Sequence, residues 1–139
     1  MATKKKAAAP RHRLLIVDDE ESVRLLLARH ATNGLKAEVQ LAGTCEEALH
    51  LANHYAYDAI LLDLMMPGIG GFEVLREIRA ASANMATPIL IISAVEDIAT
   101  NDRCIAAGAS GFLVKPVEQR ALEIAVKSLL AGRGKSKTG

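Results

Sequence analysis

Short runs of apolar residues alternate along this chain with longer segments in which apolar residues recur at helical spacing. The short runs predict five β-strands, at Leu14–Val17, Ala37–Ala42, Ala59–Leu62, Pro88–Ile92 and Gly111–Val114. The first, third and fourth runs are apolar throughout, which is typical of strands buried on both faces of a sheet. The second run alternates apolar and polar residues, so it is predicted to lie at a half-exposed edge.

The segments between and after the strands predict five helices. They are expected to begin near Ser22, Thr44, Phe72, Ile98 and Glu118, and four of them to end near Thr32, Ala81, Ala107 and Ala131. In the first helix, Leu25 and Leu26 are expected to face the sheet, and Asn33-Gly34 is expected to end the helix. Thr44 has a glutamate three residues later, which is the pattern of a capping box.

The alternation of apolar strands with helices predicts an α/β fold with a parallel sheet covered on both faces. The crossover connections of such a sheet are right-handed. The chain has 139 residues, which is enough for one domain with a substantial core and too few for two. We therefore expect one domain over residues 13–131, a flexible basic arm or linker at 1–12 and a flexible tail at 132–139.

Composition narrows the class of protein further. The 17 Lys and Arg residues nearly balance the 16 Asp and Glu residues, so a dedicated nucleic-acid binder with a broad basic face is not expected. No apolar run is long enough to span a membrane and no signal peptide is visible, so we expect a soluble, cytoplasmic protein without membrane insertion. Cys45 and Cys104 lack metal-binding spacing, which argues against a disulfide or a thiolate metal site.

Polar residues follow four of the five predicted strands. Asp18-Asp19 follow the first strand, Asp63 the third, Ser93 the fourth and Lys115 the fifth. Because the carboxyl ends of parallel strands meet at the same edge of a sheet, we expect these side chains to lie close together.

Three carboxylates beside one ammonium group leave an excess of negative charge that a divalent cation would balance. Mg²⁺ prefers carboxylate and water oxygens, and the sequence places no His or Cys nearby that would favour zinc. A metal ion, a lysine and a hydroxyl around one carboxylate suit phosphoryl transfer to a carboxylate oxygen. Asp63 is alone at the end of the central strand and is the predicted acceptor, while Asp19, together with Asp18, is predicted to hold the metal.

The residues behind these predictions resemble the motifs of one known family. They are Val17-Asp18-Asp19-Glu20, Leu62-Asp63-Leu64-Met65-Met66-Pro67-Gly68, Ile92-Ser93-Ala94 and Lys115-Pro116. From about Arg13 to Ala131 the chain is similar to the receiver domains of two-component response regulators, the CheY-like family. The resemblance implies a flavodoxin-like (βα)5 doubly wound fold whose five-stranded parallel sheet has the order 2-1-3-4-5.

The resemblance also implies a role for each matching residue. Asp63 would accept a phosphoryl group from the phosphohistidine of a sensor histidine kinase or a phosphotransfer protein. The implied Mg²⁺ ligands are Asp18, Asp19, Asp63 and the backbone carbonyl of Met65. The residues implied to bind the phosphoryl group are Ser93, Ala94 and Lys115.

A conformational switch is implied at two further positions. Ser93 would move inward after phosphorylation, and Phe112 would fill the space that Ser93 leaves. Pro116 would follow a cis peptide bond. The output face would comprise the fourth helix, fifth strand and fifth helix, and it would bind an unknown downstream effector or form a homodimer. Beyond self-catalysed phosphotransfer and slow autodephosphorylation, no enzyme activity is expected.

Two other functions remain open at this point. The first is an aspartyl-phosphate hydrolase, which is disfavoured because Asp63-Leu64-Met65 lacks the second aspartate of an Asp-x-Asp pair. The second is a pseudo-receiver that binds partners without being phosphorylated. Loss of an acidic residue or of the lysine would favour that alternative, and Asp18, Asp63 and Lys115 are all present.

Overall fold

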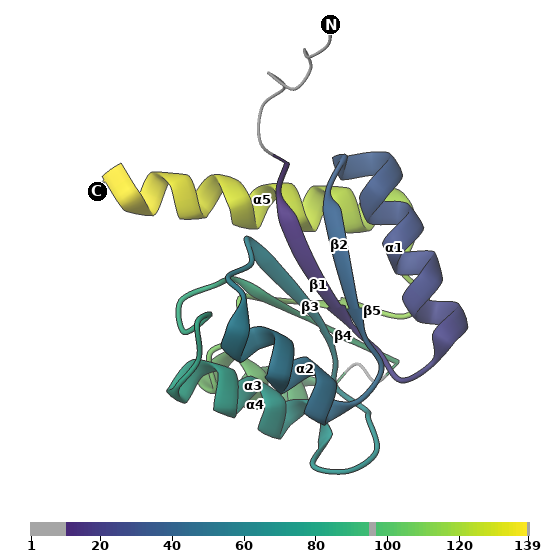
Figure 1. Cartoon of the computed structure of the whole chain (residues 1–139), viewed down its shortest axis with the longest axis vertical. Coiled ribbons are helices and arrows are strands. Elements are labelled where there is room, and N and C mark those ends of the chain that lie inside the picture. The colour runs from purple at the N-terminus through teal and green to yellow at the C-terminus, as the bar shows by residue number, and fades with distance from the viewer. Residues whose placement is uncertain (1–10, 95–96, 139) are drawn as a thin grey trace, which may run out of the picture.

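The computed structural model describes residues 11–94 and 97–138, and for residues 133–138 it describes the backbone alone. Strands and helices alternate along the described chain (Figure 1). The strands are β1 (Arg13–Val17), β2 (Glu38–Ala42), β3 (Ala59–Asp63), β4 (Ile89–Ser93) and β5 (Gly111–Val114). The helices are α1 (Glu21–Leu35), α2 (Cys45–His54), α3 (Gly70–Ala80), α4 (Ile98–Ala106) and α5 (Gln119–Thr138).

The five strands form one parallel sheet in the order β2-β1-β3-β4-β5, so the predicted fold class and strand order are confirmed. β3 is the central strand and is buried throughout, whereas β2 lies at an edge and is partly exposed, as predicted. The register aligns the carboxyl ends of β1, β3, β4 and β5. This alignment places the polar residues that follow these strands at one edge of the sheet.

Helices cover both faces of the sheet (Figure 1). Leu27 and Ala31 of α1 pack with Leu122 and Val126 of α5 on one face, against alternate residues of the strands. α2, α3 and α4 supply the core of the opposite face. The strands thus separate two apolar layers, and both hold the sheet in the geometry that the site requires. No helix in the described part of the chain is long and apolar enough to cross a membrane.

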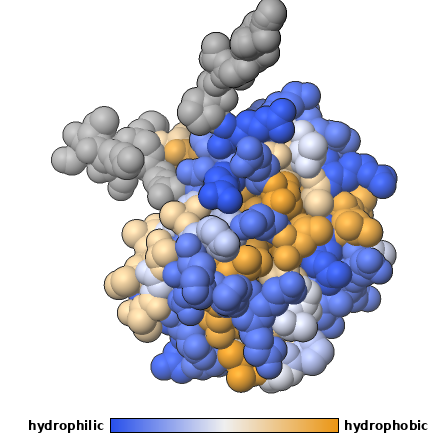
Figure 2. Space-filling model, in the orientation of Figure 1, coloured by the Kyte–Doolittle hydropathy of each residue, from blue (hydrophilic) through white to orange (hydrophobic). Residues whose placement is uncertain are grey.

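The orientation and the end of α1 differ from the prediction. Leu25 and Leu26 do not face the sheet, since they are 50% and 41% exposed, and Leu27 and Ala31 are buried instead. Adjacent helical residues point about 100° apart, so a run of three leucines does not determine which one is buried. In Figure 2, hydrophobic residues reach the surface in the region where Figure 1 places α1.

The pair Asn33-Gly34 does not end α1, because the helix continues to Leu35. The left-handed residue that closes the helix is Lys36, with φ of 54°. A Cβ on Gly34 would meet only the flexible end of the Glu123 side chain, which shows that the end of α1 lies against α5. The helix therefore ends in a local left-handed cap, in which the Lys36 amide donates to carbonyls of the last turn.

The starts of the other helices agree with the sequence more closely, whereas the end of α5 does not. Thr44 caps α2 as predicted, accepting a hydrogen bond from the amide of Glu47 at 3.1 Å. α3 begins at Gly70, two residues before the predicted start. α5 continues to Thr138, through the segment for which a flexible tail was predicted. Residues 132–138 contain two glycines but no proline, and glycine weakens a helix without removing a hydrogen bond. The predicted basic arm lies mostly outside the described residues.

Candidate functional site

The structure brings the predicted polar residues together at the carboxyl edge of the sheet. The Lys115 Nζ atom lies 2.8 Å from Asp18 Oδ2 and 3.4 Å from Asp63 Oδ1. One carboxylate oxygen from each of Asp18, Asp19 and Asp63 lies within 4.8 Å of the others. Asp18 and Asp63 are buried, whereas Asp19 is exposed, so the cluster opens toward solvent on the Asp19 side.

Short backbone contacts hold the two buried carboxylates in place. The Glu20 amide donates to Asp18 Oδ1 at 2.9 Å, and the Met65 amide donates to Asp63 Oδ1 at 3.2 Å. In each case the side chain accepts a bond from the amide two residues later, as aspartates at turns do. The end of β3 is also tightly packed, because a Cβ on Gly71 would lie 2.2 Å from the Asp63 carbonyl oxygen.

Burial and like charge make Asp63 unusual among carboxylates. Burial, followed by the charge of Asp18, raises the pKa of Asp63 to about 6, although Lys115 opposes the shift. For Lys115, burial lowers the pKa, but the hydrogen bond and charges of Asp18 and Asp63 together outweigh burial and raise it. Lys115 therefore stays charged at neutral pH, and Asp63 is a carboxylate that an additional cation would stabilise.

The donor set fits a hard divalent cation. Apart from the ammonium of Lys115, no described group contacts the buried Asp18 Oδ2 atom as a hydrogen-bond donor. Three carboxylates and one ammonium group leave two negative charges when Asp63 is ionised. Carboxylate oxygens are the ligands that Mg²⁺ prefers, and the exposed Asp19 leaves a side at which water ligands can remain.

The other predicted site residues belong to the next two strands. Ser93 lies on β4, Ala94 directly follows β4, and Phe112 lies on β5. Ser93 is the last residue of β4 and is fully buried, and Ala94 follows it at the surface. The backbone amide of Lys115 donates to the Ser93 carbonyl at 2.8 Å, which joins the ends of β4 and β5. Phe112 is partly buried and lines a cavity of about 230 Å³ with residues of α4. The peptide bond between Lys115 and Pro116 is cis.

One cation beside the site was missed by the sequence analysis. Arg24, on α1, donates from its NH1 atom to the Asp18 carbonyl at 2.7 Å. It also lies close to Gly43, since a Cβ there would be 2.8 Å from the same NH1 atom. The three consecutive acidic residues after β1 were the signal for such a cation, because their like charges repel one another. The residue that supplies this cation depends on which side chain of α1 points back toward the turn after β1.

Comparison with known proteins places these features in a family. The response regulator receiver domain family matches residues 14–127. The transcriptional regulatory protein ResD of Bacillus subtilis is 38% identical over 118 residues, which are 85% of this chain and 48% of ResD. The chain spans about half the length of the first curated relatives it matches.

Solved structures give the same result. The chemotaxis protein CheY4 of Vibrio cholerae has a TM-score of 0.82 and 30% identity, over 86% of this chain and 99% of that one. The receiver domain of the sensor histidine kinase PA1611 from Pseudomonas aeruginosa has a TM-score of 0.80 and 25% identity, over 88% and 99% of the two chains. That structure has a magnesium ion coordinated in its active-site cleft.

Proposed function

The chain belongs to the response regulator receiver domain family of two-component signalling, and from this premise we propose that it accepts a phosphoryl group on Asp63. The observation that carries the proposal is the arrangement of the two buried carboxylates, Asp18 and Asp63, around Lys115. Phosphorylation of an aspartate is the general function of this family. The donor would be a phosphohistidine on a sensor histidine kinase or a phosphotransfer protein.

In the proposed reaction, an Asp63 carboxylate oxygen attacks the phosphorus atom of the phosphohistidine. A phosphorus–oxygen bond forms, the phosphorus–nitrogen bond breaks, and its electron pair stays on the imidazole, which regains a proton. The product is an acyl phosphate on Asp63. Asp63 must be ionised to attack, and the pKa of about 6 leaves it mostly ionised at neutral pH.

Asp18, Asp19, Asp63 and the backbone carbonyl of Met65 are the proposed ligands of Mg²⁺. Bound there, Mg²⁺ would neutralise negative charge that develops on the transferring phosphoryl oxygens. Lys115 already pairs with Asp18 and Asp63, and it would exchange part of this contact for a phosphoryl oxygen. Ser93 and the amide of Ala94 lie at the end of the neighbouring strand, and we assign them to the remaining phosphoryl oxygens.

An apolar cavity of about 360 Å³ beside Lys115 supports a protein as the phosphoryl donor. It is lined by Val23, Leu26, Leu27, Ala94, Lys115, Pro116 and Val117. The exposed side chain of Leu26 gives this part of α1 an apolar surface next to the site. A donor protein would bury apolar side chains there while its phosphohistidine reaches Asp63. A small phosphorylated metabolite would gain little from such a surface.

The signal would leave through α4, β5 and α5. Inward movement of Ser93 toward the phosphoryl group would let Phe112 turn into the core, and the cavity between Phe112 and α4 gives the ring space to move. This face would bind an effector or a second copy of the chain. The charge of an added phosphoryl group, about −1.5 to −2, would drive the change.

The test is the intact mass of the protein after incubation with phosphoramidate, a small donor with a phosphorus–nitrogen bond, and Mg²⁺. We expect wild-type protein to gain about 80 Da, the mass of one phosphoryl group. Asp63→Asn should gain nothing, while Asp102→Asn on α4 should behave as wild type. If the mass stays unchanged with this donor and with phosphohistidine donors, the chain acts as a partner-binding pseudo-receiver instead.

A further inference from the structure

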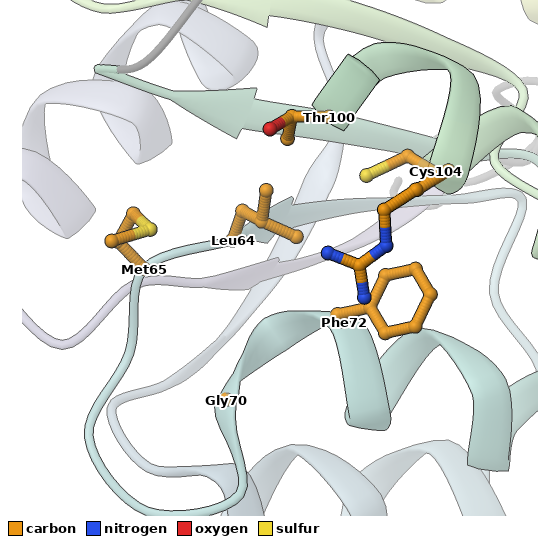
Figure 3. Close-up of a pocket in the computed structure, with 7 residues that line it drawn as sticks. Leu64, Met65, Gly70, Phe72, Thr100 and Cys104 are labelled. Atoms are coloured by element: carbon orange, nitrogen blue, oxygen red, sulfur yellow. The ribbon is translucent and has the colours of Figure 1, made fainter.

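A second cavity, of about 350 Å³, lies between the loop that follows β3 and the helix α4 (Figure 3). Its lining residues are Leu64, Met65, Gly70, Phe72, Thr100, Arg103 and Cys104. The first four come from the loop and the start of α3, and the last three from α4. Its volume lies at the lower end of the range for small-molecule sites in proteins.

Arg103 is the one charged residue in the lining of this cavity. Its guanidinium carbon lies 4.3 Å from the centre of the Phe72 ring, which is the geometry of a cation–π contact. Among the described residues, none offers the guanidinium a carboxylate within ion-pair distance or an acceptor within hydrogen-bond distance.

Two arginines of the neighbouring helix α3 use their donors. Arg76 on α3 pairs with Glu73 at 3.0 Å, and Arg79 donates to three backbone carbonyls, including that of Gly108 at 2.9 Å. A guanidinium has five N–H donors in its plane, and stacking on a ring uses only its face. The edge of Arg103 is therefore available to an anion.

The remainder of the lining is apolar or already paired. Leu64, Met65 and Phe72 contribute carbon and sulfur atoms, and Cys104 is fully buried. The Thr100 hydroxyl donates to Asp97 Oδ2 at 2.9 Å, so it is engaged with its own helix cap. A ligand that fits this lining has an apolar body and one negative group directed at Arg103.

We propose that this cavity binds a small organic anion with a flat apolar ring, such as an aromatic carboxylate. The carboxylate would pair with the edge of the Arg103 guanidinium, and the ring would lie against Leu64, Met65 and Phe72. A charge-assisted bidentate contact of this kind is among the stronger polar contacts available to a carboxylate. Binding needs neither phosphorylation of Asp63 nor Mg²⁺, so its success or failure is independent of the proposed phosphotransfer.

The test is a titration of the full ¹⁵N-labelled chain, followed by amide chemical shifts in two-dimensional NMR. The probe is 2-naphthoate, and the matched neutral probe is 2-naphthamide. We expect 2-naphthoate to shift the amides of Leu64, Gly70 and Cys104. The neutral amide should bind at least about tenfold more weakly, because it lacks the charge that pairs with Arg103. Binding of 2-naphthoate should be the same with and without Mg²⁺.

Two variants with the same charge change separate a site from general attraction. Arg103→Gln should weaken 2-naphthoate binding at least about tenfold, whereas Arg76→Gln, on the exposed surface of α3, should leave it unchanged. Circular dichroism melting of both variants checks that they are folded. Equal binding of the two probes, or equal loss in the two variants, would overturn the proposal. So would shifts that do not cluster around the cavity, because Arg103 would then only cover the ring of Phe72.

Discussion

Ionisation of Asp63 in the absence of a metal lowers the free energy of unfolding of the protein. Its pKa rises from 3.8 in the unfolded reference to about 6 in the folded protein, because of burial first and the Asp18 charge second. The folded state therefore binds more protons than the unfolded state between these two values. By linkage, stability falls as pH rises through this window, and the fall is nearly complete by about pH 7.

This shift predicts that Asp63→Asn stabilises the metal-free protein, and does so more at pH 7.5 than at pH 4. The difference at pH 7.5 should be on the order of 2–3 kcal/mol, from about 1.4 kcal/mol per pKa unit. Urea unfolding in EDTA at the two pH values measures it. Asp102→Asn, at an exposed position of α4, is the control. A stability difference for Asp63→Asn that does not change with pH would contradict the assigned pKa.

Lys115 would compete with a bound Mg²⁺ for the same carboxylates. Its ammonium lies 2.8 Å from Asp18 and 3.4 Å from Asp63. We expect Lys115→Gln to tighten Mg²⁺ binding by roughly tenfold, since a positive charge beside the ligands is removed. Isothermal titration calorimetry gives the affinity, and Lys127→Gln on the exposed surface of α5 carries the same charge change. Unchanged or weaker Mg²⁺ binding in Lys115→Gln would show that the metal does not bind at this cluster.

At the scale of elements, the close contact between the start of α3 and the end of β3 fixes the loop that follows Asp63. Gly71 is in contact with this strand end, where a Cβ would lie 2.2 Å from the Asp63 carbonyl oxygen and 2.7 Å from the Leu64 Cα. Backbone atoms of a central strand have little room to move. The loop and the helix therefore behave as one packed unit.

A pair of glycine substitutions tests this contact. Gly71→Ala should lower the free energy of unfolding by about 3 kcal/mol or more, because the new methyl group overlaps backbone atoms. Gly132→Ala in α5 has nothing within 4 Å of the new methyl group and should be neutral or stabilise by up to about 1 kcal/mol. Urea unfolding curves compare the two. Similar stabilities of the two variants would rule out a tight packing of α3 on the end of β3.

The sequence predicted the strands better than it predicted the helix faces and ends. Runs such as Ile60 to Leu62 are apolar at every position, so burial on both faces leaves no ambiguity. The leucines of α1 left the buried face ambiguous, and Lys36, not Asn33-Gly34, took the left-handed conformation. A residue other than glycine seldom adopts this conformation, so the sequence did not mark Lys36 as the end of the helix.

Polar contacts between residues far apart in the chain could not be predicted from the sequence. Asn84 lies buried in the α3–β4 loop, where its Nδ2 donates at 2.7 Å to the carbonyls of both Ala52 and Tyr55. Its Oδ1 accepts from the Tyr57 amide at 2.8 Å. These bonds tie the end of α2 to the start of β3. Nothing in the local pattern distinguishes this asparagine from one in an exposed loop.

At the scale of the molecule, the site follows from topology. A parallel sheet brings the ends of β1, β3, β4 and β5 to one edge, so Asp18, Asp63, Ser93 and Lys115 could be placed together from the sequence. The positions of Arg24 and Arg103 could not be predicted, because a long side chain reaches a partner that depends on how the helices pack. Polar side chains at the ends of strands could therefore be predicted from the sequence, whereas the long side chains that extend from helices could not.

Metal binding should stabilise the whole domain, because the cluster forms only in the folded chain. At a Mg²⁺ concentration one hundred times its dissociation constant, the gain would be about 2.7 kcal/mol. We expect the melting temperature to rise with Mg²⁺ and to return on addition of EDTA. Asp19→Asn should remove most of the rise, and Asp102→Asn should keep it. An equal rise in both variants would place the metal elsewhere.

The most direct test of the account is to locate the phosphoryl group on the chain. Protein treated with acetyl phosphate and Mg²⁺ is reduced with borohydride, which converts an aspartyl phosphate to homoserine, and its peptides are sequenced by mass spectrometry. We expect homoserine at position 63 alone, and none in protein that was not phosphorylated. Homoserine at Asp18, at Asp19 or at an exposed carboxylate in place of Asp63 would contradict this expectation.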